Sequence, residues 1–197
     1  KDFTIECIYK RYFSKDVSLS RTMVNMILKY LGNMPKNCKI LDLGCKGGLI
    51  GAEFGNKLDQ HFYIKGVEYN QALAELSTQI AQDNSRIYDD IINKDISDFL
   101  NAQHTTQYNI ITCFDSLSFI KDLGNIFIGI SRILKKGGIL AILLQKSPNQ
   151  TNIANDYVSF KFSQSDVESQ LRLAKFSISN IKSTIVGKET YFLIIAI

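Results

Sequence analysis

A glycine-rich turn near residue 44 is the first segment with residue types suited to ligand binding. A short apolar run leads into it, and the whole reads LDLGCKGG over 41–48. Glycine permits left-handed backbone angles and lets a ligand approach the main chain closely. A helix that begins at Gly48 would also offer free backbone N–H groups at its N-terminus. We therefore expect a ligand beside this turn.

A carboxylate follows at a matching place in the sequence. Glu68 ends the next apolar run, twenty residues after Gly48. In a parallel sheet, an acidic residue at that strand end can accept hydrogen bonds from both hydroxyls of a ribose. Taken singly, the two features also fit an ordinary strand-to-helix turn and a solvated strand end. At this spacing they predict a site for a nucleoside-bearing cofactor.

Short apolar runs alternate with helical patterns, and this alternation decides how the turn and the carboxylate are held. We expect strands at 39–43, 61–68, 91–92, 108–114 and 139–145 with helices between them, then two final strands at 176–186 and 191–197. No helix separates the final two strands, so they should pair antiparallel. Strands joined by helices pair in parallel. The sequence predicts an α/β fold, a three-layer α-β-α sandwich around a seven-stranded, mostly parallel sheet with an antiparallel last strand.

Polar residues indicate where the helices begin. Asn70 and Asp122 each stand directly before a helical pattern and are expected N-caps. Ser20 is the expected cap of the first helix. Ser165 and Glu168 have the spacing of a capping box for the last helix.

Composition limits the class of protein. The chain has 197 residues, of which 45% are hydrophobic and 21% charged, as in one packed domain. No window of about 18 residues is free of charge, so we expect no membrane span. Four cysteines without a CxxC pair, and only two histidines, favour reduced thiols over a disulfide framework or a metal site. We therefore expect a cytoplasmic protein without a bound metal.

The positive charge is concentrated at the N-terminus. Residues 1–39 hold eight Lys/Arg and three Asp/Glu, whereas residues 40–197 hold 15 and 16. We expect a helical lead-in over 1–38, which either caps the site or packs as a solvated helix, and the predicted α/β domain over 39–197. The chain begins at Lys1 and not at Met, which fits a fragment of a longer protein.

The order of the motifs resembles class I S-adenosylmethionine-dependent methyltransferases. ILDLGCKGG (40–48) is similar to their first motif. The similarity continues through VEYN (67–70), INKDISDFL (92–100), YNIITCFDSLSFI (108–120) and ISRILKKGGILAI (130–142). Within that superfamily, the chain most resembles bacterial methyltransferase domains attached to tetratricopeptide repeats, and YVSFKFSQSDVESQL (157–171) supports this placement. The resemblance implies a Rossmann-like methyltransferase fold with S-adenosyl-L-methionine as cofactor.

The resemblance also implies which residues contact that cofactor. Those along its methionine part are Asp42, Gly44, Cys45 and Gly48. Those around the adenosine are Glu68 for the ribose hydroxyls, Tyr69 beside the adenine, and Asp95 and Ile96 at the adenine edge, where Asp95 accepts from the amino group. Those near the sulfonium and its methyl group are Phe114 and Asp115.

Catalysis requires little beyond this arrangement. Methyl transfer from a sulfonium is an in-line displacement, so positioning in a dry pocket can supply most of the effect. A general base is needed only where the acceptor starts protonated. Asp115 is the candidate for that role, and its alternative role is to cap the following helix. Tyr9, Arg11 and Tyr12 lie in the lead-in, which in resembling proteins often folds over the cofactor; surface packing is the alternative.

One residue departs from the motif. The middle glycine of the usual loop is Lys46 here, and left-handed backbone angles cost a residue with a side chain about 1–2 kcal/mol. The lysine charge either repels the sulfonium or pairs with the carboxylate of the cofactor. A degenerate module that binds or scaffolds without turnover is therefore the alternative function.

The methyl acceptor leaves no positive signature. No Asn/Asp-Pro-Pro-aromatic run follows the fourth strand, which argues against N-methylation of adenine or glutamine of the usual kind. No Pro-Cys follows Cys113, which argues against attack on a cytosine ring through a thiolate. The near-neutral charge of residues 40–197 does not favour nucleic acid, so the expected acceptor is a small molecule or a protein. Ser147, Tyr157 and Lys161 have the order of the catalytic set of short-chain NAD(P) oxidoreductases, but Lys46 breaks the GxGxxG pattern which that class requires.

Overall fold

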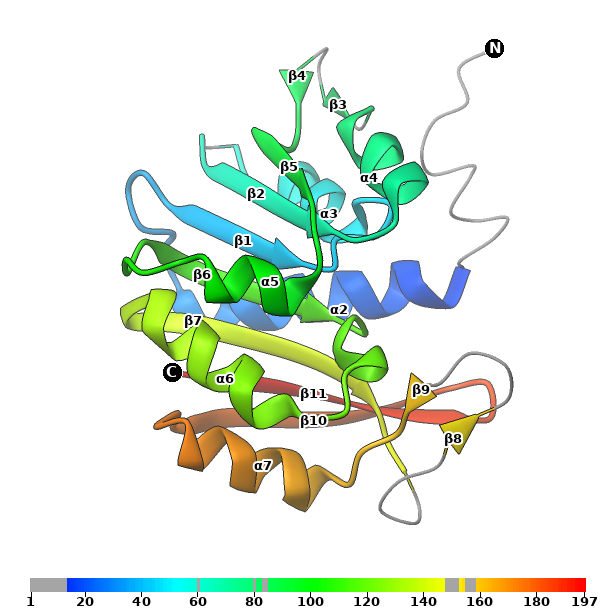
Figure 1. Ribbon diagram of the computed structural model, residues 1–197. Coiled ribbons are helices and arrows are strands. Elements are labelled where there is room, and N and C mark those ends of the chain that lie inside the picture. The colour runs from blue at the N-terminus through cyan, green and yellow to red at the C-terminus, as the bar shows by residue number, and fades with distance from the viewer. Residues whose placement is uncertain (1–13, 60, 80, 83–84, 148–152, 155–158) are drawn as a thin grey trace.

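The structure is a computed structural model that describes residues 14–59, 61–79, 81–82, 85–147, 153–154 and 159–197. Its elements alternate along the chain (Figure 1). They are α2 (Ser14–Leu31), β1 (Lys39–Leu43), α3 (Leu49–Lys57), β2 (Tyr63–Glu68), α4 (Gln71–Thr78), β3 (Ala81–Gln82), β4 (Ser85–Arg86), β5 (Asp90–Asn93), α5 (Ile96–Asn101), β6 (Tyr108–Phe114), the 3₁₀ turn η1 (Leu117–Phe119), α6 (Leu123–Ile133), β7 (Leu134–Gln145), β8 (Ile153–Ala154), β9 (Ser159–Phe160), α7 (Gln164–Leu173), β10 (Ile178–Val186) and β11 (Glu189–Ala196).

Seven strands form one sheet in the order β10-β11-β7-β6-β1-β2-β5. The five strands from β7 to β5 pair in parallel, and β11 runs antiparallel to both of its neighbours. The predicted sheet, with its antiparallel last strand, is confirmed. In the sheet, β1 lies between β2 and β6. The chain passes from β1 to β2 on one side of β1, and the later strand β6 pairs on its other side. The crevice between the loops after β1 and β6 is therefore the switch point where such sheets bind ligands.

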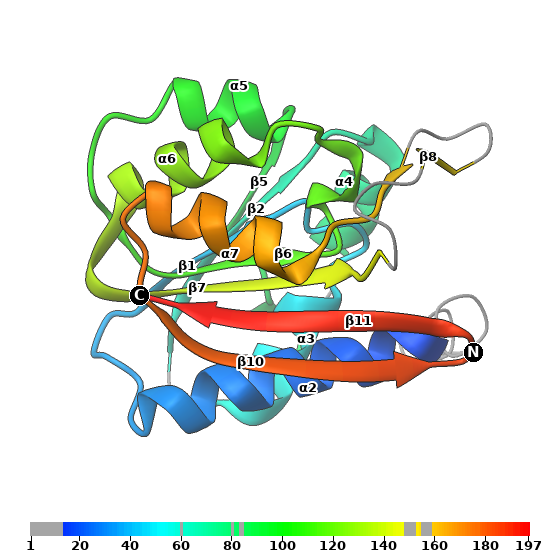
Figure 2. The same ribbon diagram turned by 90° about the horizontal axis from the view of Figure 1, so that it is seen from below.

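Helices cover both faces of the sheet, which gives the predicted three layers (Figure 2). Helices α5, α6 and α7 bury their apolar stripes on one face, and α2 and α3 bury theirs on the other. Successive side chains of the central strands point to opposite faces of the sheet, as the two-residue period of a strand requires. On β7, for example, Ile142 belongs to the first core and Leu143 to the second.

Two of the four expected helix caps are present. Asn70 Oδ1 accepts from Leu73 N at 3.1 Å, and Asp122 Oδ1 accepts from Gly124 N at 3.0 Å. The prediction for Ser20 is wrong because α2 begins earlier, at Ser14, and the Ser20 hydroxyl donates within the helix.

The cap of α7 is shifted by two residues from the expected one. Ser163 has an extended backbone, and its Oγ accepts from Asp166 N at 3.2 Å. Ser165 therefore lies inside the first turn. Glu168 pairs with Arg172 at 3.1 Å instead of closing a capping box.

Helix α2 belongs to the core although it precedes the first strand. Its buried residues Leu19, Met23, Val24 and Ile27 pack in the same cluster as Ile40 of β1. Tyr9, Arg11 and Tyr12 lie outside the described residues, so the predicted cap over the site stays a prediction. Within the described residues, no helix combines the length and the apolar character needed to cross a membrane.

Helix α6 offers a direct test of the two-faced packing. Phe127 is fully buried, and its neighbour Ile128 is 53% exposed. We expect Phe127→Ala to lower the free energy of unfolding by about 3–5 kcal/mol because it leaves a cavity in the core. Ile128→Ala on the same helix should change it by no more than about 0.5 kcal/mol. Urea denaturation followed by circular dichroism measures both; equal losses would contradict the assignment of faces.

Candidate active site

The loop after β1 is held in a tight left-handed course. Gly44, Lys46 and Gly48 have φ angles of 69°, 51° and 86°. A Cβ on Gly44 would lie 2.2 Å from Ser116 Cβ, so the loop after β6 packs directly on this glycine. From the other side, Gly44 N and Cys45 N both donate to Val67 O of β2, at 2.7 and 3.0 Å. The loop is thus clamped between the ends of β6 and β2.

Asp42 lies beneath this loop and is fully buried. Its Oδ1 accepts from Thr112 Oγ1 and its Oδ2 accepts from Tyr88 OH, both at 2.7 Å. Tyr88 OH in turn accepts from Gly51 N at 3.0 Å. Burial raises the pKa of Asp42 to about 6, although the two hydroxyl donors oppose this. The carboxylate therefore ties β1 to β6, to the start of α3 and to the segment before β5.

Glu68 ends β2 beside the loop, and its side chain is fixed by backbone groups. It is 8% exposed. Its Oε2 accepts from Lys46 N and its Oε1 from Asn70 N, both at 2.8 Å. Within the described part of the chain, no ion pair involves Glu68. Each carboxylate oxygen keeps a second lone pair, so the group can accept two more hydrogen bonds from a vicinal diol.

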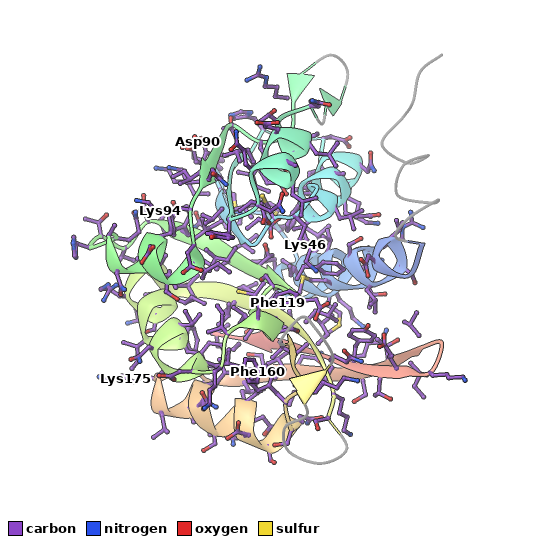
Figure 3. The ribbon with its side chains drawn as sticks, turned by 45° about the vertical axis from the view of Figure 1, so that its right-hand side comes forward. Lys46, Asp90, Lys94, Phe119, Phe160 and Lys175 are labelled. Carbon is purple, nitrogen blue, oxygen red and sulfur yellow. The ribbon has the colours of Figure 1, made fainter. Side chains whose placement is uncertain are left out.

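The end of β6 faces the loop from the opposite side of the crevice. Asp115 follows the strand with a left-handed φ of 52°, and its Oδ1 accepts from Ser118 Oγ at 2.7 Å. Lys46 Nζ lies 3.8 Å from Asp115 Oδ2 and 5.6 Å from the centre of the Phe114 ring. The Lys46 side chain thus spans from the β1 loop to the C-terminal end of β6. Figure 3 labels Phe119 and Phe160 on the same side of the molecule.

The other predicted contact residues differ in exposure. Tyr69 is 77% exposed, whereas Cys45, Ile96 and Phe114 are buried. Burial raises the pKa of the Cys45 thiol, which suits a packed, unreactive group. Asp95 is the N-cap of α5, and its Oδ1 accepts from Ser97 N at 2.7 Å.

Several residues that hold the site were missed by the sequence argument. Asn93 Nδ2 donates to both Glu68 O and Tyr69 O at 2.8 Å, and Ser77 Oγ donates to Lys46 O at 2.6 Å. Tyr88 and Thr112 hold Asp42. Nothing in their neighbouring sequence indicates these pairings, because each partner lies at least 24 residues away. Tyr157 of the oxidoreductase alternative lies outside the described residues.

A cavity of about 330 Å³ among the described residues lies elsewhere. It is lined by residues at the C-terminal ends of α2 and α3 and just after them, among them Leu28, Met34 and Leu58. These helix ends lead into the N-terminal ends of β1 and β2, whereas the glycine-rich loop lies at the C-terminal end of β1. Asp42, Glu68 and the left-handed residues Gly44, Lys46, Gly48 and Asp115 lie together at the C-terminal ends of the strands, so we place the functional site there.

Comparison with known proteins gives a consistent family. Residues 41–140 match the family model described as "Methyltransferase domain". A search of curated proteins found no match. Since the family match spans the turn, Glu68 and the end of β6, it covers the whole candidate site.

Solved structures share the fold at low sequence identity. A SAM-dependent methyltransferase from Methanosarcina mazei is 16% identical, with a TM-score of 0.71 over 85% of this chain and 95% of that one. The 1,6-didemethyltoxoflavin-N1-methyltransferase of Burkholderia thailandensis, solved with S-adenosylhomocysteine, is 17% identical, with a TM-score of 0.72 over 95% and 81%. The [4+2]-cyclase SpnF is 14% identical, with a TM-score of 0.72 over 90% and 80%. These likenesses show the fold, and the fold alone does not decide the reaction.

The buried Asp42 makes stability depend on pH. Its pKa in the folded protein, about 6, lies above the ordinary value of 3.8, so its ionisation removes stability as pH rises from about 4 through 6. Thr112→Val deletes a donor to the charged form. We expect a loss of about 1.5–3 kcal/mol in the free energy of unfolding at pH 8 and a smaller loss at pH 5. Urea denaturation at both pH values measures this; equal losses would contradict the role of Thr112.

Proposed function

This chain belongs to the methyltransferase domain family, and from that premise we propose that it transfers a methyl group from S-adenosyl-L-methionine to a small-molecule or protein acceptor. The observation that carries the proposal is the Glu68 carboxylate. It is held by Lys46 N and Asn70 N at the switch point of the sheet, with acceptor capacity left on both oxygens. That chemistry fits the two hydroxyls of a ribose.

The other residues of the crevice fit the rest of the cofactor. Gly44 and Gly48 have left-handed backbone angles and no side chains, so nothing shields their main chain from the crevice. The N-terminus of α3 has no side-chain cap. We assign the methionine part to this loop and to Asp42 and Cys45 behind it. Tyr69, which is exposed beside Glu68, and the turn at Asp95 and Ile96 are assigned to the adenine.

The bound cofactor would supply an activated methyl group on a sulfonium. The task of the protein is to hold the acceptor in line with that methyl and to exclude water. We assign Phe114 and Asp115 to that end of the site because Phe114 is the last residue of β6 and Asp115 follows it directly. Asp115 carries a carboxylate at the mouth, so it is the candidate to take a proton from an acceptor that starts protonated.

The surroundings of Asp115 support an acceptor with apolar surface. Phe119 lies four residues on, in η1, and is 60% exposed. Residues 40–197 carry a net charge near zero, which does not favour nucleic acid.

As part of the same proposal, residues 1–38 form a lead-in to the catalytic domain, and the chain is of the kind attached to tetratricopeptide repeats. The buried free thiols of Cys38, Cys45 and Cys113 support a cytoplasmic setting.

A binding or scaffold module without turnover is the second candidate. The observation in its favour is the Lys46 side chain, which lies across the mouth of the crevice and pairs with Asp115. Titration calorimetry with S-adenosylmethionine and S-adenosylhomocysteine separates the two candidates. Binding of both ligands excludes a scaffold that has lost the cofactor site, as the methyltransferase requires, and no heat at millimolar ligand supports the scaffold.

Glu68 gives the proposal a specific test. We expect Glu68→Gln and Glu68→Ala to weaken binding of S-adenosylhomocysteine by about 1.5–3 kcal/mol because charge-assisted hydrogen bonds to the ribose are lost. Calorimetry measures the affinity, and thermal unfolding checks that the variants fold. Glu75→Gln is the matched control, since Glu75 is an exposed glutamate on the adjacent helix α4. Unchanged affinity in both Glu68 variants would remove Glu68 from the ribose site.

A further inference from the structure

Lys46 has a backbone conformation that favours glycine, and it has a counterpart across the crevice. Among the described residues, four other than glycine have positive φ angles: Asn37, Lys46, Asp115 and Lys175. Two of the four, Lys46 and Asp115, face each other with opposite charges at the ends of adjacent strands. Strained residues that gather at a site suggest that their side chains have a function there.

The contact between these two side chains is weak enough to be exchanged. Lys46 Nζ and Asp115 Oδ2 are 3.8 Å apart, and both side chains are 32% exposed. Ion pairs of this length and exposure contribute little to stability. The backbone of Lys46 is fixed independently, because its N–H donates to Glu68 and its C=O accepts from Ser77. The ammonium can therefore change partner without disturbing the loop.

We propose that Lys46 recognises the carboxylate at the amino-acid end of the cofactor and exchanges Asp115 for it on binding. This inference rests on the proposed function and deepens it. The amino-acid end of S-adenosylmethionine carries a carboxylate and an ammonium. When it enters beside the loop, the carboxylate takes the Lys46 ammonium, and the Asp115 carboxylate is released toward the acceptor. A charge-assisted hydrogen bond from Lys46 to the ligand is stronger than the long pair with Asp115 that it replaces.

Two ligands that differ only at that end test the proposal. S-Adenosylhomocysteine has the amino acid, and 5′-methylthioadenosine has a methyl group in its place. We expect Lys46→Met, which keeps the length of the side chain without its charge, to weaken S-adenosylhomocysteine binding about ten-fold, or about 1.4 kcal/mol. Binding of 5′-methylthioadenosine should change less than about two-fold. Lys46→Gly should show the same selectivity, and calorimetry measures all four affinities.

Lys175 provides a matched control. It is an exposed lysine with a left-handed φ of 70° just after α7, and Figure 3 shows it at the lower left margin, away from Lys46. Lys175→Met and Lys175→Gly remove the same charge and relieve the same kind of backbone strain away from the site. Neither should alter the affinity for either ligand, and thermal unfolding checks all variants for folding.

The outcomes are distinguishable. A loss confined to S-adenosylhomocysteine in the Lys46 variants supports the proposal. Unchanged affinity for S-adenosylhomocysteine, or equal loss for both ligands, overturns the role of Lys46 and leaves the proposed function intact. Failure of the unaltered chain to bind either ligand overturns the proposed function and this inference together.

Discussion

A buried negative charge organises the candidate site. Asp42 has no contact with water, so its carboxylate must be satisfied by the protein, and Thr112 of β6 and Tyr88, which precedes β5, do this. Leaving such a group without donors is expensive, which forces β1, β6 and the segment before β5 into one arrangement. The glycine turn lies on top of this arrangement, and Glu68 is held by the turn. The position of each group at the mouth therefore follows from the charge below it.

The sheet was predictable from the sequence, because strand periodicity and the intervening helices are local patterns. The caps at Asn70 and Asp122 were predictable for the same reason. Ser20 and Ser165 show the limit: several serines stand near each helix start, and only the backbone angles decide which one caps. The positions of the turn and of Glu68 were also predictable. The hydroxyls around Asp42 were not, since Tyr88 reaches it across 46 residues.

Lys46 shows how a departure from a motif is accommodated. A left-handed angle at this position was expected to strain a lysine, and the structure has φ 51° there. The main chain of Lys46 nevertheless makes the contacts that the loop requires, to Glu68 and Ser77. The side chain lies in the crevice, where it contacts the end of β6. The loop thus keeps the left-handed backbone of the motif, and Lys46 adds a positive charge where the motif has a glycine.

The packing of α2 has a practical consequence for anyone who trims this protein. The family match begins at residue 41, and a recombinant fragment starting there would omit Leu19, Met23 and Ile27. Those side chains shield one face of the sheet together with α3. Without them, a broad apolar surface would meet water, and such surfaces promote self-association. The smallest soluble unit should therefore include the first described helix.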